Sequence, residues 1–340
     1  MGTVRSLVWN RDGHEIAEDF PFAEISDFLA RKDTLTWVDL CEPDHDDLNR
    51  LADELSLDPL AVEDAIARVE RPKALRYATH TFFTVYSAHY PDAADAGAES
   101  KTDEVDLAER IELNKISAFV FHSGLITVRS PKFDVDDLEA RWRDNGDMLR
   151  YGVGTLVHGL LDAVVDSHFD AVQVLDDAIE DIEDVLFDDR ILATRVQRAT
   201  YRLRKELVEL RRIVLPMREV VNGVLRHRRD AGAAPELDAS YDDLYDHVLR
   251  VTEWTESLRD MVSALFETNL SLQDSRLNNV MKKLTSWAAI IAVPTAVTGY
   301  FGQNVPYPGF GQWWGFLLSV GVMVAAAGIL YLVFKRKNWI

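Results

Sequence analysis

The sequence predicts an α/β N-terminal domain, a stalk of long α-helices and two C-terminal membrane-spanning helices. Three observations support this fold class. Strand-forming segments separated by short helices occupy residues 1–133. Over residues 134–283 the strand patterns stop, and apolar residues recur at helical spacing. Residues 284–340 contain two long apolar segments without internal charges, joined by a short loop over residues 302–312.

The N-terminal region combines predicted strands with two capped helices. Asp44 is a typical N-cap for a helix that runs through Ser56. Asp58, followed by a proline at the first helical position, starts a second helix that runs through Ala67. Segments rich in β-branched and aromatic residues predict strands at Leu7–Trp9, Thr34–Leu40, Thr79–Tyr90, Ile111–Phe121 and Leu125–Arg129.

The stalk begins with an acidic helix followed by a basic one. Apolar residues from Leu156 to Leu186 predict a helix of about forty residues, and a second helix extends from Thr194 to about Arg229. Two interpretations stay open: the charges are solvated faces of a helical hairpin, or the acidic face concentrates cations. The acidic face comprises Asp166, Asp170, Asp176, Asp177, Glu180, Asp181, Glu183, Asp184, Asp188 and Asp189, and the basic one Arg195, Arg198, Arg202, Arg204, Lys205, Arg211 and Arg212.

A third helix is predicted to continue from the stalk into the membrane. The segment 232–235, Gly-Ala-Ala-Pro, ends the second helix, and no further proline occurs before Pro294. A continuous helix from Ser240 to Tyr300 is about 90 Å long at about 1.5 Å per residue. Such a rod cannot be buried within one small domain, so we expect it to pack against copies of itself in an oligomeric funnel.

The two apolar segments, Leu284–Phe301 and Trp313–Phe334, are long enough to cross a bilayer. Lys282 and Lys283 precede the first span, and the basic run 335–337 follows the second. Because basic residues favour the cytoplasmic side, both termini are predicted to be cytoplasmic and the loop between the spans external. The expected location is the cell (inner) membrane, as a multi-pass protein with two spans and with the α/β domain in the cytoplasm.

Composition limits the classes of function. A net charge of −20 over 340 residues disfavours nucleic acid as a partner and favours cations. The single cysteine, Cys41, rules out an internal disulfide and suits a reducing compartment. No N-terminal signal peptide is visible. The sequence has no GxxxxGK[ST] phosphate loop, no HExxH pair and no GxSxG motif, so we expect neither a nucleotide partner nor an enzyme.

One face of the first span is small or polar throughout. Small residues permit close packing of membrane helices, and polar ones line water-filled paths. An ordinary two-helix anchor, with the small face packed on the second span, is the alternative. The predicted pore-lining residues are Asn278, Met281, Leu284, Thr285, Ala288, Ala292, Thr295 and Gly299.

This segment resembles the pore helix of the CorA family of divalent-cation transporters. The family pattern is an Asn, then Met-Lys-x-Leu-Thr, a proline within the span and a Tyr-Gly-Met-Asn signature at its outer end. The matching residues are Asn278, Met281-Lys282-Lys283-Leu284-Thr285, Pro294 and Phe301-Gly302-Gln303-Asn304, with weaker matches over Leu60–Ile66, Glu70–Lys73 and Lys335–Ile340. Gln303 departs from the methionine of the signature, and a related zinc-transporting branch carries Gly-Ile-Asn.

The resemblance implies a CorA-like funnel in the form of a homopentamer, with the first span lining a central path. It implies a selectivity filter at Gly302, Gln303 and Asn304. It also implies a regulatory divalent-ion site shared between subunits, with Asp64 of one chain and Asp243 of its neighbour. From the residues alone, Asp243, Asp246 and His247 share one helical face, but hard divalent ions usually need more oxygen ligands than one helix supplies.

The expected function is membrane transport of divalent cations, gated by cation binding in the cytoplasm. Mg²⁺ is the expected transported and regulatory ion, with Co²⁺ and Ni²⁺ as further candidates. Two alternatives remain: a proton-coupled zinc transporter of the Gly-Ile-Asn branch, which Gln303 keeps open, and a non-conducting oligomeric sensor anchored in the membrane. The expected partners are divalent metal ions, further copies of the chain and the lipid bilayer.

Overall fold

The structure, a computed structural model, describes residues 3–91, 111–187, 193–303 and 305–340. It divides into two compact units, residues 1–265 and 266–340. The first unit holds the strands β1 (Thr3–Asn10), β2 (Glu15–Glu18), β3 (Thr34–Cys41), β4 (Lys73–Arg76), β5 (Thr81–His89), β6 (Glu112–Val120) and β7 (Gly124–Arg129). Its α-helices are α1 (Ile25–Ala30), α2 (His45–Leu55), α3 (Pro59–Ile66), α4 (Val135–Asp144), α5 (Val153–Leu186) and α6 (Ala193–Asp230), with the first part of α7 (Asp238–Phe301).

The strands form one seven-stranded sheet in the order β2-β1-β3-β7-β6-β5-β4. Neighbouring strands are antiparallel except β3 and β7, which pair in parallel. A chain segment must therefore cross from the end of β3 back to the start of β7. This topology brings the end of β1 and the starts of β3 and β5 to the same edge of the sheet.

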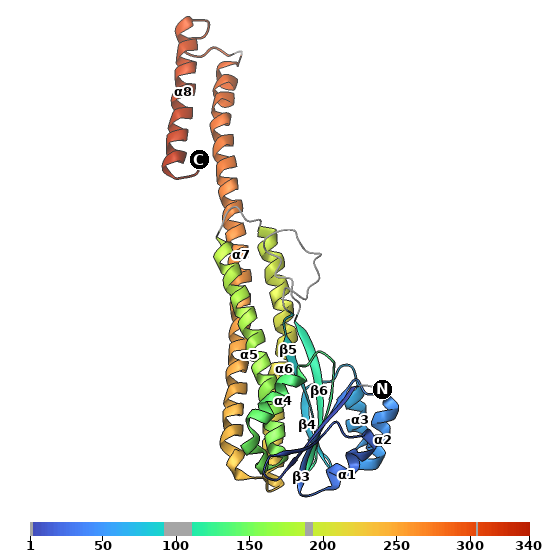
Figure 1. Cartoon of the computed structure of the whole chain (residues 1–340). Helices are drawn as coiled ribbons and strands as arrows, with labels where there is room; N and C mark the ends of the chain where they lie inside the picture. Colours follow the sequence, from blue (N-terminus) through green and yellow to red (C-terminus); the bar gives the residue numbers. More distant parts are fainter. Residues whose placement is uncertain (1–2, 92–110, 188–192, 304) are drawn as a thin grey trace. The chain divides into compact units, whose positions relative to one another are not determined.

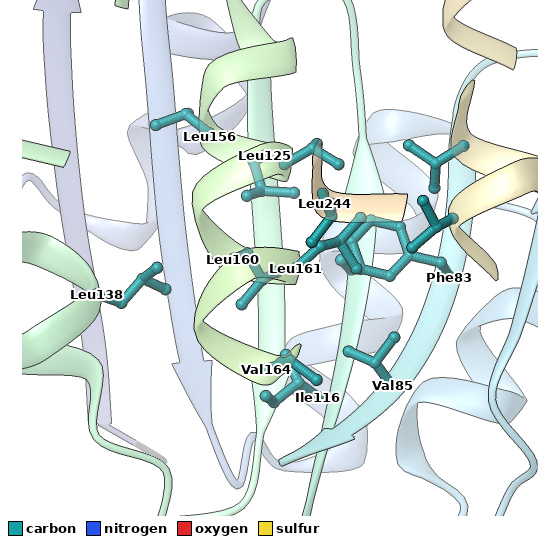
Figure 2. Packing of buried hydrophobic residues seen from close by; sticks show 14 of the residues in the cluster. Phe83, Val85, Ile116, Leu125, Leu138, Leu156, Leu160, Leu161, Val164 and Leu244 are labelled. Carbon is teal, nitrogen blue, oxygen red and sulfur yellow. The ribbon is translucent and has the colours of Figure 1, made fainter. Parts of the chain in front are cut away.

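The sheet separates two hydrophobic cores, because successive side chains of a strand point to opposite faces. Trp37 and Phe83 belong to the core beneath α4–α7, whereas their neighbours Val38 and Phe82 belong to the core beneath α1–α3. Figure 1 shows these two groups of helices on opposite sides of the sheet. Figure 2 shows part of the larger core, to which α5 contributes Leu156, Leu160, Leu161 and Val164, and α7 contributes Leu244.

Local signals account for several element boundaries. The Asp58 carboxylate accepts a hydrogen bond from the Leu60 N–H at 2.9 Å, and Pro59 occupies the first position of α3. Asp134 caps α4 in the same way, accepting from the N–H groups of Asp136 and Asp137. These contacts satisfy N–H groups that a helix start leaves without partners.

The predicted fold class is confirmed, with differences in detail. Strands β2 and β4 were not predicted, since each has only four residues and lacks a buried apolar alternation. The predicted helix of about forty residues is α5, with 34 residues. It begins after Gly152, which follows α4 and a 3-10 turn over Gly146–Tyr151. The φ of Gly152 is +84°, a conformation that favours glycine.

The charged faces of the stalk pair in part with other elements. Arg141 of α4 lies 2.7 Å from Asp166 and 3.7 Å from Asp162 of α5. Asp176 of α5 accepts a hydrogen bond from the Trp254 indole N–H of α7 at 3.1 Å. The acidic face therefore contacts both α4 and α7, and its predicted members Asp188 and Asp189 lie outside the described residues.

The helix α7 is continuous over 64 residues, as predicted, and includes Pro294. Up to Leu265 it buries an apolar face that includes Tyr241, Leu244 and Val248. Over residues 266–301 only Asn269 and Ser286 are buried. The second unit thus consists of the remainder of α7 and of α8 (Trp313–Arg336). These two helices are long and apolar enough to cross a membrane.

Candidate cation pathway and sensing site

The stripe of small and polar residues on α7 is exposed along its whole length. The exposed positions include every predicted pore-lining residue, namely Asn278, Met281, Leu284, Thr285, Ala288, Ala292, Thr295 and Gly299. Met281 and Leu284 expose 52% and 64% of their surface. This face is therefore not buried within residues 266–340.

The less exposed side of α7 lies roughly opposite to this stripe. Ser286 is buried, and Ile290, Val293 and Val297 are half-buried. At about 100° of rotation per residue, these positions share the other half of the helix. Helix α8 has a matching half-buried or buried stripe of mostly small residues, Gly315, Ser319, Met323, Ala326, Ala327, Leu330 and Phe334. The hairpin has one partly covered side, and the predicted pore face is not on it.

Two threonines near Pro294 donate their hydroxyl hydrogens to backbone carbonyls of α7. Thr298 Oγ1 donates to the Pro294 carbonyl at 2.8 Å, and Thr295 Oγ1 lies 3.4 Å from the Ile291 carbonyl. A hydroxyl that donates to the backbone keeps its lone pairs as acceptors. Thr295 can therefore present an oxygen ligand on the exposed stripe.

The outer end of α7 requires a glycine at position 302. The Gly302 N–H donates to the Thr298 carbonyl at 2.8 Å. A Cβ added at Gly302 would lie 2.8 Å from the same oxygen, which is too close for any other residue. Gln303 is exposed. Asn304, the predicted narrow outer end of the pore, lies outside the described residues.

Aromatic contacts organise the chain on either side of this position. The Phe301 and Tyr307 rings meet edge to face with centroids 5.0 Å apart, and Tyr307 meets Phe310 in the same way at 5.3 Å. Edge-to-face pairs stabilise beyond the apolar area that they bury. They link the end of α7 to the loop before α8.

Asp64, near the end of α3, is part of an ionic cluster within its own chain. Its carboxylate lies 2.8 Å from Lys73 Nζ, and Lys73 also lies 3.1 Å from Glu70. The side chains of Asp64 and Lys73 are only 17% and 20% exposed. Lys115 of β6 donates to three backbone carbonyls at the end of α3, those of Asp64, Ala65 and Ala67.

The pKa values in this cluster follow from burial and from the neighbouring charges. Burial lowers the pKa of Lys115 to about 8, although Glu70 and Asp64 oppose the shift. Burial would also lower the pKa of Lys73, but its hydrogen bonds and charge interactions with Asp64 and Glu70 outweigh this and raise it. Lys73 is therefore a firmly charged partner for Asp64 near neutral pH.

Asp243, Asp246 and His247, which were predicted to share one face of α7, differ in their surroundings. The Asp243 side chain is 72% exposed, and Asp246 is also exposed. His247 is packed edge to face on Phe169 of α5, with ring centroids 6.0 Å apart. Its Nε2 lies 3.7 Å from the Asp243 carboxylate, which is too long for a hydrogen bond. His247 is therefore not hydrogen-bonded to Asp243, and its Nδ1 has no hydrogen-bond partner.

One chain does not bring the proposed regulatory carboxylates together. Asp64 belongs to α3, which packs on one face of the sheet, whereas Asp243 belongs to α7, which packs on the other. Among the described residues, no group of three or more His, Cys, Asp or Glu side chains is placed to hold a metal ion. A site that uses both Asp64 and Asp243 therefore requires a second chain.

Sequence reasoning did not find Lys73 and Lys115 as members of the Asp64 cluster. Lys73 lies in a short strand and Lys115 in a long one, and each reaches α3 only through the fold of the sheet. The short segment Glu70–Lys73 was noted as a weak match to the family pattern, but nothing local in it indicates which carboxylate the lysine faces.

The first unit combines an α/β sheet with long helices, and the second contains two helices that are long and apolar enough to cross a membrane. One of these helices carries an exposed stripe of small and polar residues, which is typical of a membrane transport protein. A family model described as "CorA-like Mg2+ transporter protein" matches residues 32–336. The chain belongs to this family and is accordingly a divalent-cation transporter. The match confirms the predicted family. Because this is a family of transporters, the match also confirms the prediction that the chain is not an enzyme.

Relatives match over most of their length. The "Cobalt/magnesium transport protein CorA" of Thermotoga maritima is 29% identical over 95% of this chain and 89% of its own. The protein with the same name from Methanocaldococcus jannaschii is 25% identical over 90% of this chain and 92% of its own. The complete structure of the CorA magnesium transporter from M. jannaschii has a TM-score of 0.71 at 22% identity and covers both chains fully. The full-length CmaX structure has a TM-score of 0.72 at 19% identity, over 99% of this chain and 98% of its own.

Proposed function

We propose that this protein carries Mg²⁺ across the cell membrane through a central path lined by α7 helices of several copies of the chain. The observation that carries the proposal is the exposed stripe on α7, from Asn278 to Gly299, opposite to the partly covered side of the hairpin. Co²⁺ and Ni²⁺ are further candidate substrates. Relatives named for cobalt and magnesium transport support this choice.

The chemistry of the stripe suits a hydrated ion. Mg²⁺ releases its first-shell waters reluctantly, so a pore for it works best by hydrogen bonding to those waters. Hydroxyl and amide oxygens, such as those of Thr295, Asn278 and Asn304, accept such hydrogen bonds without a full charge that would trap the ion. Gly302 leaves room for the backbone at the outer end, and Gln303 adds a further amide.

The path requires an oligomer, for which the family resemblance implies a homopentamer. A single α7 exposes its polar stripe, and a lipid-exposed stripe of this kind is unfavourable in a membrane. Several copies around an axis place the stripes against one another and leave the outer sides of the hairpins to lipid. Both termini then lie in the cytoplasm, because Lys282, Lys283 and the run 335–337 flank the spans.

The membrane potential is a sufficient driving force. An inside-negative potential contributes about 2.3 kcal/mol per charge per 100 mV, which is about 4.6 kcal/mol for a divalent ion. Transport therefore needs no hydrolysis of a nucleotide. Ion binding between Asp64 and Asp243 of neighbouring chains would oppose carboxylate repulsion and hold the closed state, so that low internal Mg²⁺ favours opening.

Uptake of Mg²⁺, Co²⁺, Ni²⁺ and Zn²⁺ into liposomes containing the purified protein tests this function. Asn304→Ala should abolish selective uptake and leave the oligomer intact in size-exclusion chromatography. Asn279→Ala is the matched control, since Asn279 is exposed on the same helix but outside the stripe. Undiminished selective uptake by Asn304→Ala contradicts the assignment, and absence of flux from the unaltered protein identifies a non-conducting sensor.

Zinc transport coupled to protons is the second candidate, and Gln303 is the residue that favours it over the common signature. The cytoplasmic domain of ZntB from Vibrio parahaemolyticus has a similar fold, with a TM-score of 0.57 at 10% identity over 81% of this chain and 100% of its own. Imposing a pH gradient separates the candidates. Proton coupling requires zinc uptake to rise when the outside is more acidic. A passive channel responds only to the concentration gradient of the ion and the membrane potential, so its zinc uptake should not follow the pH gradient.

A further inference from the structure

The first unit contains a large cavity at the sheet edge where β1 ends and β3 and β5 begin. The cavity has a volume of about 520 Å³, which is within the range of sites for small organic ligands. Its far wall is formed by the start of α5, the end of α6 and the start of α7, which meet at one end of the unit in Figure 1. It is separate from the Asp64 cluster and from the α7 stripe.

The lining of this cavity is basic, although the chain as a whole is acidic. Asp and Glu account for 57 of the 340 residues, yet neither occurs among the described residues that line the cavity. The lining includes five Arg or Lys residues and three His residues: Arg11, Lys32, Arg76, Arg150, Arg228, His80, His122 and His227. Such a concentration of positive charge in a protein of net charge −20 favours an anionic ligand.

Several of these cations have no carboxylate partner. Arg76 pairs with Asp230 at 3.2 Å, and Arg228 pairs with Asp238. Within the described part of the chain, Arg11, Lys32 and Arg150 are not within ion-pair distance of any carboxylate; Arg11 donates only to the Lys32 carbonyl, at 3.0 Å. The net charge of the lining is therefore positive after the internal ion pairs are taken into account.

One buried side chain that lines the cavity has donors without a hydrogen-bond partner. Arg228 is 7% exposed, and its Nε and Nη1 have no hydrogen-bond partner. A buried polar group without a partner is destabilising. A ligand with anionic oxygens would satisfy these groups.

The start of α5 adds a second feature that attracts anions. This helix of 34 residues begins at the cavity with Gly152-Val153-Gly154 and has no side-chain cap and no acidic residue in its first turn. The first N–H groups of a helix and its dipole favour a bound anion. A Cβ added at Gly154 would lie 3.6 Å from Arg228 Nη1, so the free guanidinium nitrogen is next to this turn.

The end of α6 does not cancel this effect, because its last carbonyls already have donors. The N–H groups of Ala231 and Ala233 donate to the carbonyls of His227 and Arg228. The Gly232 N–H donates to the Arg229 carbonyl at 3.1 Å. The negative end of the α6 dipole is therefore largely satisfied within the chain.

The size and the apolar part of the lining indicate the kind of anion. The cavity is far larger than an inorganic phosphate needs, and the rings of Tyr77, Phe121, Tyr151 and Tyr241 contribute to its wall. We propose that this cavity binds a small organic phosphate of nucleotide size, with its phosphate at the α5 start beside Arg228.

Binding can be measured by isothermal titration calorimetry on the full-length protein in detergent, with EDTA present so that divalent ions do not contribute. AMP and ATP should bind saturably, inorganic phosphate at least about tenfold more weakly, and adenosine not measurably. A single charge-assisted hydrogen bond is worth about 1.5–3 kcal/mol, so Arg150→Gln and Lys32→Gln should each weaken binding about tenfold or more.

Both substitutions are at exposed positions, so the variants should fold normally. Arg31→Gln is the matched control, since Arg31 is exposed next to Lys32 but does not line the cavity, and it should bind as the unaltered protein does. The proposal is overturned if AMP and ATP show no saturable binding at millimolar concentration. Equal losses in Arg31→Gln and Lys32→Gln would also overturn it. Since the assay involves no transport and no metal, its outcome is independent of the proposed transport function.

Discussion

Lys73 Nζ lies 2.8 Å from the Asp64 carboxylate, so the group proposed to sense a divalent cation already binds a cation of its own chain. Glu70 holds the same lysine at 3.1 Å. A divalent ion that reaches Asp64 must displace Lys73 or share the carboxylate with it. We therefore expect Lys73 to compete with the proposed ion and to raise the ion concentration needed for occupancy.

Replacing this lysine should make the proposed sensor more sensitive. Lys73→Gln removes a positive charge beside the ligand, and we expect protection against proteolysis to appear at about three- to tenfold lower Mg²⁺. Lys132→Gln is the control, because Lys132 pairs with Glu112 at the surface and away from Asp64. An unchanged Mg²⁺ midpoint in Lys73→Gln would show that Asp64 does not bind the regulatory ion.

Removing both carboxylates should abolish sensing. Saturating Mg²⁺ stabilises the folded protein by RT ln(1 + [L]/Kd) for each independent site. The double variant Asp64→Asn, Asp243→Asn should lose most of the Mg²⁺-dependent increase in Tm and should be less inhibited by internal Mg²⁺. Asp242→Asn, at an exposed position next to Asp243, controls for the loss of surface charge. Full Mg²⁺ protection in the double variant would place sensing elsewhere, with the acidic face of α5 as the next candidate.

Gln303 should influence which ion is preferred. Placed next to Asn304 in several copies, its amide changes the hydrogen bonds offered to a hydrated ion. We expect Gln303→Met to shift the ranking of ions in liposome uptake towards that of proteins with the Gly-Met-Asn signature. An identical ranking in the two proteins would assign Gln303 to packing of the outer loop.

His168 should make the first unit sensitive to acid. It is fully buried, and burial lowers its pKa from 6.5 to about 4, although a hydrogen bond with the Tyr86 carbonyl opposes the shift. Because the carbonyl can only accept, Nε2 carries the proton of the neutral ring. Between these two pKa values the unfolded chain binds more protons than the folded one, so acid favours unfolding.

Titration of His168 should therefore lower the free energy of unfolding as the pH decreases from 6.5 to 4. The decrease should be up to about 1.4 kcal/mol for each pH unit. Chemical denaturation at several pH values measures this slope. His168→Gln should reduce the slope by about one proton equivalent. A slope that is equal in the two proteins would show that His168 does not titrate in this range.

Features that depend on near neighbours in the chain could be predicted from the sequence. The cap at Asp58 and Pro59 and the continuity of α7 follow from helix rules that involve only a few consecutive residues. The stripe on α7 follows from the period of one helix, and the structure finds all of its residues exposed. The family was predicted from short motifs in the same region and confirmed by the match over residues 32–336.

Contacts between distant segments were decided only by the tertiary structure. Strand β4 has no apolar alternation, and it forms because β5 offers it backbone partners. The pairing of Lys73 with Asp64 joins a strand to a helix, and the basic cavity joins residues from Asn10 to Tyr241. The sequence alone predicted the long helices, the two apolar segments and the polar stripe, because periodicity and capping act over one or two turns. The partner of each charge and the position of the cavity depend on how the sheet brings remote segments together, which no local pattern encodes.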